Sequence, residues 1–133
     1  MLHEKRGRDL VQIVLGLIVF GAGLALVVRG ANGQGPWTVF HDGLSQHTPL
    51  TIGTATILTG VVLLVLVAIM GVRIGLGTVL NVLIIGPATD ATLWLVPEPD
   101  AALGRVSLTI LAPLVVALGS GLYLGVHWGA GAA

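Results

Sequence analysis

The sequence predicts an all-α membrane protein with four transmembrane helices, one short amphipathic or re-entrant helix and an incomplete inverted repeat. Composition carries the first part of this prediction. Only 9% of the residues are charged and 55% are hydrophobic, whereas an ordinary soluble domain is about 25% charged. A chain of 133 residues cannot hide that apolar excess in its interior. A soluble enzyme is therefore excluded.

The positions of the charges divide the chain into spans. A helix needs about 20 mostly apolar residues to cross about 30 Å of hydrocarbon. Stretches of this length that are almost free of charge lie at residues 10–28, 51–70, 76–96 and 105–126. The first follows a short basic tail (1–9), but it is longer than the apolar run of a signal peptide and lacks a small-residue cleavage site. We expect it to be a retained helix.

Basic residues near the span ends predict the orientation of the chain. With a cytoplasmic N-terminus, the inner side carries four of them and the outer side two: Lys5, Arg6, Arg8 and Arg73 inside, Arg29 and Arg105 outside. The sequence therefore favours a multi-pass protein with its N-terminus, residues 1–9, in the cytoplasm.

The outer loop, residues 29–50, contains a predicted short helix over residues 36–46. A glycine-rich stretch ends at Gly35, and Pro36 can open a helix because its missing N–H is not needed at the first position. The helix is too short to span, so we expect it to lie at the outer interface or to dip between the spans. After it, Thr51 offers a hydroxyl to the free N–H groups at the start of the second span.

Side chains on this short helix could form a metal site or an ion pair. Trp37 belongs to its apolar face, and His41 and Asp42 lie on other faces. His41, His47 and Asp42, without a third nitrogen or sulfur ligand, match no strong metal-binding spacing, so we expect no metal and no cofactor. Arg29 and Asp42 could pair, and a solvated pair within the loop is the expected outcome.

Asp90 is the acidic residue inside a predicted span. A carboxyl at this depth is costly, so one interpretation is a functional group that faces a cavity or a partner. In the other, Gly86 and Pro87 break the helix, and Asp90 stabilises the first turn of the restarted helix. The two can coexist, because half-helix ends at mid-membrane build transporter sites. Asn81 lies opposite Asp90 on a straight helix, and we expect it to hydrogen-bond between helices.

Six of the 20 glycines form small-xxx-small steps within or beside the spans. Small residues let helices in lipid approach closely, so we expect these steps to pack helices within the chain, with a homo-oligomer or a gate as the alternative. The steps are Gly21/Ala25, Gly71/Gly75 and Ala117/Gly121/Gly125/Gly129.

A short signature near the end of the first span recurs in the fourth. Gly21-Ala-Gly-Leu-Ala-Leu26 and Gly119-Ser-Gly-Leu-Tyr-Leu124 are 98 positions apart. A repeat unit of that length would hold three spans, so its second copy would be inverted in the membrane. The fourth span would then open a second unit, and the chain would be a partial or short form of a larger protein. The alternative is chance agreement between two glycine-rich stretches.

The sequence lacks the motifs of enzymes and of nucleotide-binding proteins. The chain has no Gly-x-Ser-x-Gly context and no phosphate-binding loop, and its net charge of zero offers no basic surface for nucleic acid. We therefore expect neither an enzyme nor a nucleic-acid-binding protein. The lipid bilayer is the expected surrounding, and the sequence identifies no soluble partner.

Three segments, in this order and spacing, resemble blocks of the YitT/YczE-type family of bacterial integral membrane proteins: residues 35–44, 50–54 and 75–90. The resemblance covers essentially the whole chain. It implies a bacterial plasma membrane location and, because members are usually longer with more spans, a partial or short member. The resemblance implies a catalytic role for none of the positions that match the family: Gly35, Pro36, Trp37, His41, Asp42, Gly43, Asn81, Gly86, Pro87 and Asp90.

These observations favour a small-solute or ion transporter, or part of one. The alternative is a non-transporting membrane scaffold or regulatory subunit that binds protein or lipid partners. The candidate solute or ion contacts are Asp90, Asn81, Gly86, Pro87, Gly35, Pro36, Trp37, His41 and Asp42.

Overall fold

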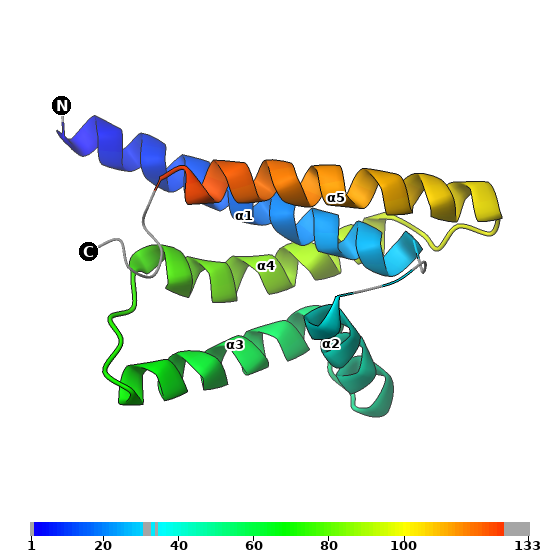
Figure 1. Cartoon of the computed structure of the whole chain (residues 1–133), viewed down its shortest axis with the longest axis horizontal. Helices are drawn as coiled ribbons and strands as arrows, with labels where there is room; N and C mark the ends of the chain where they lie inside the picture. Colours follow the sequence, from blue (N-terminus) through cyan, green and yellow to red (C-terminus); the bar gives the residue numbers. More distant parts are fainter. Residues whose placement is uncertain (1, 31–32, 34, 127–133) are drawn as a thin grey trace.

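A computed structural model describes residues 2–30, 33 and 35–126, and this part of the chain is built from helices (Figure 1). They are α1 (Leu2–Gly30), α2 (Pro36–His47), α3 (Ile52–Ile69), α4 (Leu76–Leu95) and α5 (Ala102–Leu124). Four of them, all but α2, are long and apolar enough to cross a membrane. The predicted fold class, a helical membrane protein, is confirmed.

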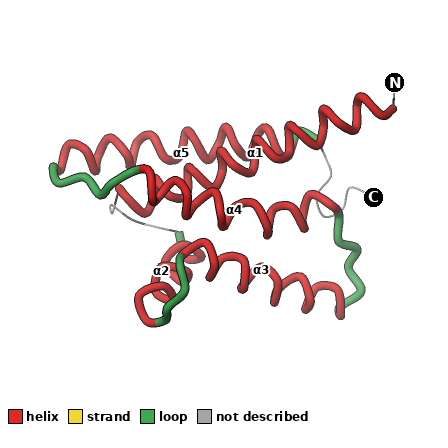
Figure 2. The backbone as a smooth tube through the Cα atoms, turned by 180° about the vertical axis from the view of Figure 1, so that it is seen from behind, coloured by secondary structure: helices red, strands yellow, loops and turns green. Residues whose placement is uncertain are grey.

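The four long helices pack in the spatial order α5, α1, α4, α3, and α2 lies against α3 (Figures 1 and 2). The chain direction reverses between α1 and α5, because Gly16 meets Tyr123 near one end of the pair and Gly30 meets Thr109 near the other. The main contacts of α3 are with α4 and α2. α3 is therefore an edge element, attached to the rest of the bundle chiefly through α4.

Glycines on α1 make its contact with α5 possible. Gly16, Gly23 and Gly30 follow at intervals of seven residues and all meet α5. A Cβ on Gly23 would lie 2.6 Å from the nearest side-chain atom of α5, and a Cβ on Gly119 would lie 2.5 Å from the backbone nitrogen of Phe20. Packing, not hydrophobic burial, holds helices together in lipid, so this backbone approach is the basis of the pair.

The expected small-xxx-small steps are used only in part. Gly21 and Ala25 are buried, with Gly21 against the backbone of α4. Gly71 and Gly75 lie outside the described helices, so the expectation that this step packs two helices is wrong for the described part of the chain: Gly71 turns the chain after α3 at φ +83°, and Gly75 is the N-cap of α4. The third step lies on the exposed side of α5 at Ala117, Gly121 and Gly125, with Gly129 outside the described residues.

The apolar core lies between α1, α4 and α5. Ile13 and Leu17 of α1 and Ile85 of α4 are its buried members. Thr89 of α4 is buried beside them, and its hydroxyl is 3.0 Å from the carbonyl of Gly21 and 2.8 Å from that of Ile85. A hydroxyl shared in this way is satisfied within its own helix and also bonds α4 to α1.

The expected helix break at Gly86 and Pro87 is wrong. α4 is continuous from Leu76 to Leu95 with Pro87 inside it. Proline removes the hydrogen bond to the carbonyl four residues earlier, here that of Leu83, and both Pro87 and Leu83 are exposed. The lost bond therefore lies on the open side of α4, where no neighbouring helix has to accommodate it.

The glycine contact between α1 and α5 can be tested with Gly119→Ala. The added Cβ would collide with the backbone of Phe20, so we expect the free energy of unfolding to fall by about 1–3 kcal/mol. Denaturant unfolding of the detergent-solubilised protein, followed by circular dichroism, measures the change. Gly7→Ala is the matched control, because a Cβ there meets nothing within 4 Å. Equal stability of the two variants would contradict the contact.

Candidate functional site

The carboxylate of Asp90 binds the N-terminus of a neighbouring helix. Its Oδ1 accepts a hydrogen bond from the backbone N–H of Gly53 at 2.8 Å, and its Oδ2 accepts one from the hydroxyl of Thr51 at 2.6 Å. Thr51 is the N-cap of α3, so an acidic group of α4 sits at the positive end of the α3 dipole. Such an arrangement is worth about 0.3–1 kcal/mol when exposed and up to about 2 kcal/mol when partly buried.

The interpretation of Asp90 as a local helix-restart residue is therefore wrong, because α4 does not restart at Pro87 and Asp90 lies well beyond its first turn. Asp90 does stabilise the N-terminus of a helix, as expected of an acidic group, but that helix is α3 and not α4. The role of Asp90 as a solute or ion contact stays a prediction.

Threonine hydroxyls extend this arrangement along the first turn of α3. The Thr51 hydroxyl accepts from the backbone N–H of Thr54 at 3.0 Å and lies 2.8 Å from the Thr54 hydroxyl. Since a hydroxyl has one proton and Thr51 donates its own to Asp90, Thr54 is the donor in the hydroxyl pair. Both threonines are exposed and Asp90 is half-buried, so this group of oxygens is open on one side.

Two glycines bring α3 and α4 close enough for these bonds. A Cβ on Gly53 would overlap the carbonyl oxygen of Gly86 and the Asp90 carboxylate, and a Cβ on Gly86 would lie 2.5 Å from the carbonyl oxygen of Gly53. We call Thr51, Gly53, Thr54, Gly86 and Asp90 the α3 N-terminal site. It joins the two helices by direct backbone contact.

A second polar contact ties α2 to α3. His41 Nδ1 lies 3.3 Å from the hydroxyl of Thr56, which also donates to the carbonyl of Ile52 at 2.8 Å. With that proton committed, Nδ1–H of His41 is the donor to Thr56, and Nε2 is the bare nitrogen. Nε2 is buried and has no hydrogen-bond partner among the described residues. Burial also lowers the pKa of His41 below its usual 6.5.

Aromatic rings surround His41 on α2. The ring of Trp37 stacks on the imidazole, with centroids 6.0 Å apart and planes at 21°, and Phe40 lies 5.6 Å away at 59°. We call Trp37, Phe40 and His41 the α2 aromatic cluster. α2 starts as expected, with Gly35 as N-cap and Pro36 in its first turn.

Arg29 does not pair with Asp42. Its Nε donates to the carbonyl of Val96 at 2.8 Å and an Nη donates to that of Leu93 at 2.6 Å, so the guanidinium binds the last carbonyls of α4. Cations are favoured at this negative end of a helix. The side chain of Asp42 makes no hydrogen bond or ion pair within the described residues. The loop pair fails because the end of α1 lies beside the end of α4.

The predicted candidates thus fall into separate places. Asp90 and Gly86 belong to the α3 N-terminal site, whereas Pro87, directly after Gly86, faces away from it and is exposed. Asn81 lies about 13.5 Å from Asp90 along α4, at 1.5 Å per residue, and its amide makes no hydrogen bond within the described part of the chain. The expectation that Asn81 bonds between helices is therefore not met within this part of the chain.

Sequence reasoning missed Gly53, Thr54 and Thr56 as parts of these contacts. A usable signal was present, since Thr51-Ile-Gly-Thr54 places hydroxyls and a glycine in the first turn of a predicted span. Which helix packs against that turn is not encoded locally.

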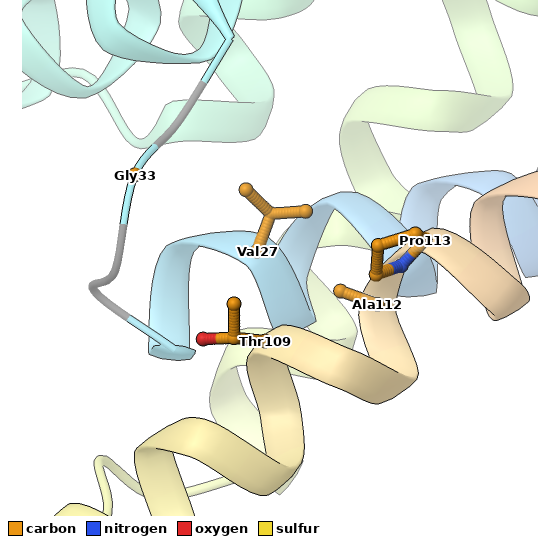
Figure 3. A pocket seen from close by; sticks show the side chains of 5 residues that line it. All are labelled: Val27, Gly33, Thr109, Ala112 and Pro113. Atoms are coloured by element: carbon orange, nitrogen blue, oxygen red, sulfur yellow. The ribbon is translucent and has the colours of Figure 1, made fainter.

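A small cavity lies away from the predicted residues, between α1 and α5 (Figure 3). Its volume is about 120 Å³, and it is lined by Val27, Gly33, Thr109, Ala112 and Pro113. Ligand pockets usually measure about 300–1,000 Å³, so this cavity is too small for a typical organic solute.

Comparison with known proteins decides the family. A family model described as a family of unknown function, DUF6198, matches residues 7–132. The chain belongs to this family. The chain is also 30% identical over 118 residues to a Bacillus subtilis protein titled uncharacterized membrane protein YczE, a match that covers 87% of the chain. The predicted resemblance to YczE-type membrane proteins is thereby confirmed.

The DUF6198 chain is shorter than its curated relatives. An uncharacterized protein of Haemophilus influenzae is 30% identical over 119 residues, which is 90% of the chain but 55% of that protein. The match to the Bacillus protein also covers 55% of the relative, so the chain spans about half the length of both. No solved structure matches the chain.

The lowered pKa of the half-buried His41 predicts a pH dependence of stability. Below pH 6.5 the unfolded chain binds a proton that folded His41, with its lowered pKa, resists. The stabilisation linked to neutral His41 is therefore complete near about pH 8 and is lost as the pH falls through 6.5 toward the lowered value. We expect His41→Gln to reduce this dependence, measured by thermal unfolding from about pH 8 to about pH 5.

The exposed His47 provides the control. His47→Gln should retain the dependence of the unmodified protein. A pH profile that is the same for His41→Gln and the unmodified protein would contradict the assignment.

Proposed function

We propose that the chain is a small-solute or ion transporter, or part of one, whose working contact is the α3 N-terminal site. The observation that supports the proposal is the carboxylate of Asp90, which lies within a span and holds α4 to the start of α3 by two hydrogen bonds. Ionisable groups within spans are costly and mark ion or substrate pathways. The proposal assigns no enzymatic reaction to the chain.

The mechanism follows from the attachment of α3. Because the main contacts of α3 are with α4 and α2, release of Asp90 from Thr51 and Gly53 lets this edge helix move against the rest. A proton or a cation that binds the carboxylate competes with these two donors. Its departure restores the bonds, so occupancy of Asp90 and the position of α3 are coupled.

Flux through reconstituted vesicles tests this assignment. Vesicles that contain the protein and the trapped pH dye pyranine receive a pH, Na⁺ or K⁺ gradient, and the dye signal is compared with protein-free vesicles. We expect protein-dependent flux, slowed about tenfold or more in Asp90→Asn, because the amide keeps the shape of the side chain but not its charge. Asp100→Asn, at an exposed loop position, is the matched control and should keep full flux.

Two results would contradict the assignment. Equal flux from Asp90→Asn and the unmodified protein would remove Asp90 from the pathway, provided both variants insert to the same extent. Flux no greater than that of empty vesicles under every gradient would remove proton transport and proton-coupled Na⁺ or K⁺ transport from the proposed function.

We further propose a bacterial plasma membrane location with a cytoplasmic N-terminus, supported by the excess of basic residues on that side. The chain has no cysteine, so single cysteines report topology cleanly. Gln46→Cys, in α2, should react with a membrane-impermeant maleimide in intact cells. Val72→Cys, between α3 and α4, should react only after permeabilisation. The reverse pattern would overturn the orientation.

A non-transporting scaffold that binds protein or lipid partners is the second candidate. The exposed side chains of α2 favour it, since Trp37, Val39 and Phe40 leave about half or more of their surface uncovered. Aromatic groups of this kind suit the headgroup region of a membrane or a protein interface. A stable partner that co-purifies with the chain and is lost in Trp37→Ser, in the absence of any flux, would favour this function.

A further inference from the structure

One ring nitrogen of the half-buried His41 has no partner. In the part of the chain that the structure describes, Nε2 of His41 is the buried side-chain nitrogen or oxygen atom that lacks a hydrogen bond. Nδ1 carries the proton of the neutral ring, because the hydroxyl of Thr56 already donates to the carbonyl of Ile52 and can only accept from His41. Neutral His41 is therefore bonded to α3 through Nδ1 and leaves a bare acceptor, Nε2, buried.

A second proton has only this buried nitrogen to bind. Imidazolium carries a proton on both ring nitrogens, so Nε2–H would be a charged donor without an acceptor. Burying an unpaired charge costs far more than burying a bare acceptor. The ring of Trp37, with its centroid 6.0 Å away, lies at the limit of a cation–π contact. Burial nevertheless lowers the pKa of His41 below 6.5, so the present position of the ring favours the neutral form.

The charged groups of the neighbouring helices do not offset a charge on His41. α3, the main neighbour of α2, carries no titratable residue, and the carboxylate of Asp90 on α4 is bound at the N-terminus of α3. Arg29, at the end of α1, is bound to the last carbonyls of α4. On α2 itself, Asp42 and His47 make no side-chain hydrogen bond or ion pair within the described residues. A protonated ring must therefore leave its place to be solvated.

This ring also attaches α2 to the bundle. α2 lies beside the start of α3 (Figures 1 and 2) and has no buried residue of its own. Within the described residues, the contact of His41 with Thr56 is the hydrogen bond that joins a side chain of α2 to another helix. A proton that drives the ring away from Thr56 therefore removes the polar attachment of the whole short helix.

We propose that His41 and Thr56 form a pH-dependent latch: a proton bound at Nε2 of His41 breaks the contact with Thr56 and releases α2 from the start of α3. Thr56 lies three residues after Gly53, which binds Asp90. With the latch closed, the first turns of α3 are bonded to both α2 and α4, and after release to α4 alone. Regulation of the α3 N-terminal site by the latch rests on the proposed function, whereas the latch itself does not.

The distance between α2 and α3 in lipid nanodiscs tests the latch. Because the chain has no cysteine, spin labels can be attached at Val39→Cys and Leu66→Cys, which are exposed on α2 and α3. Pulsed electron–electron double resonance measures their separation. We expect one main distance at about pH 8 and a second one, from released α2, whose population rises about tenfold or more by about pH 5, as the pH falls below 6.5.

Two variants and a second label pair are the controls. His41→Gln should show no effect of pH on the distances, whereas His47→Gln, at an exposed position of the same helix, should show the full effect. Labels at Val11→Cys on α1 and Leu114→Cys on α5, both exposed, should keep one distance over the whole range, because the pairing of α1 with α5 does not involve the latch.

Three outcomes would overturn the latch. They are an unchanged distance distribution in the unmodified protein at about pH 5, a shift that His41→Gln retains, and an equal change in the label pair of α1 and α5. None of these readouts depends on flux. Failure of the latch is therefore distinguishable from failure of the proposed function.

Discussion

Direct contact between glycine backbones is the constraint on which the arrangement of the spans depends. Within hydrocarbon, burying one apolar side chain against another gains little, because lipid is equally apolar. Helices must gain packing contacts instead, and each principal pair of spans has a glycine where they meet: Gly16 and Gly119 for α1 and α5, Gly21 for α1 and α4, Gly53 and Gly86 for α3 and α4. Removing Cβ at these points is what draws the axes together.

Close approach also brings polar groups into reach of one another. Gly53 and Gly86 place Asp90 at the N-terminus of α3, and the contact at Gly21 lets Thr89 reach the backbone of α1. Arg29 completes a related pattern at the C-terminal end of α4, where it binds the last carbonyls. The charged side chains of Asp90 and Arg29 thus bind the ends of neighbouring helices, where the dipole is largest, and Asp90 belongs to the site proposed for transport.

The distribution of contacts sets the scope for movement. α1 is enclosed by α4 and α5, whereas α3 is an edge helix and α5 has an open face. An edge helix joined by two carboxylate hydrogen bonds is suited to a change of position. The proposed transport therefore uses the side of the bundle on which α3 packs against α4.

Composition and charge spacing alone predicted the membrane class, the long helices and the proline-initiated short helix, because these depend only on local apolar length and backbone chemistry. They also singled out Asp90, since a carboxylate in an apolar run is visible without any structure. The partners of Asp90 and Arg29, the continuity of α4 through Pro87 and the use of Gly16, Gly23 and Gly119 instead of Gly71 and Gly75 were decided only in the tertiary structure. The reason is that each depends on which helix faces lie together, and a nearly uniform apolar sequence carries little periodic signal to specify those faces.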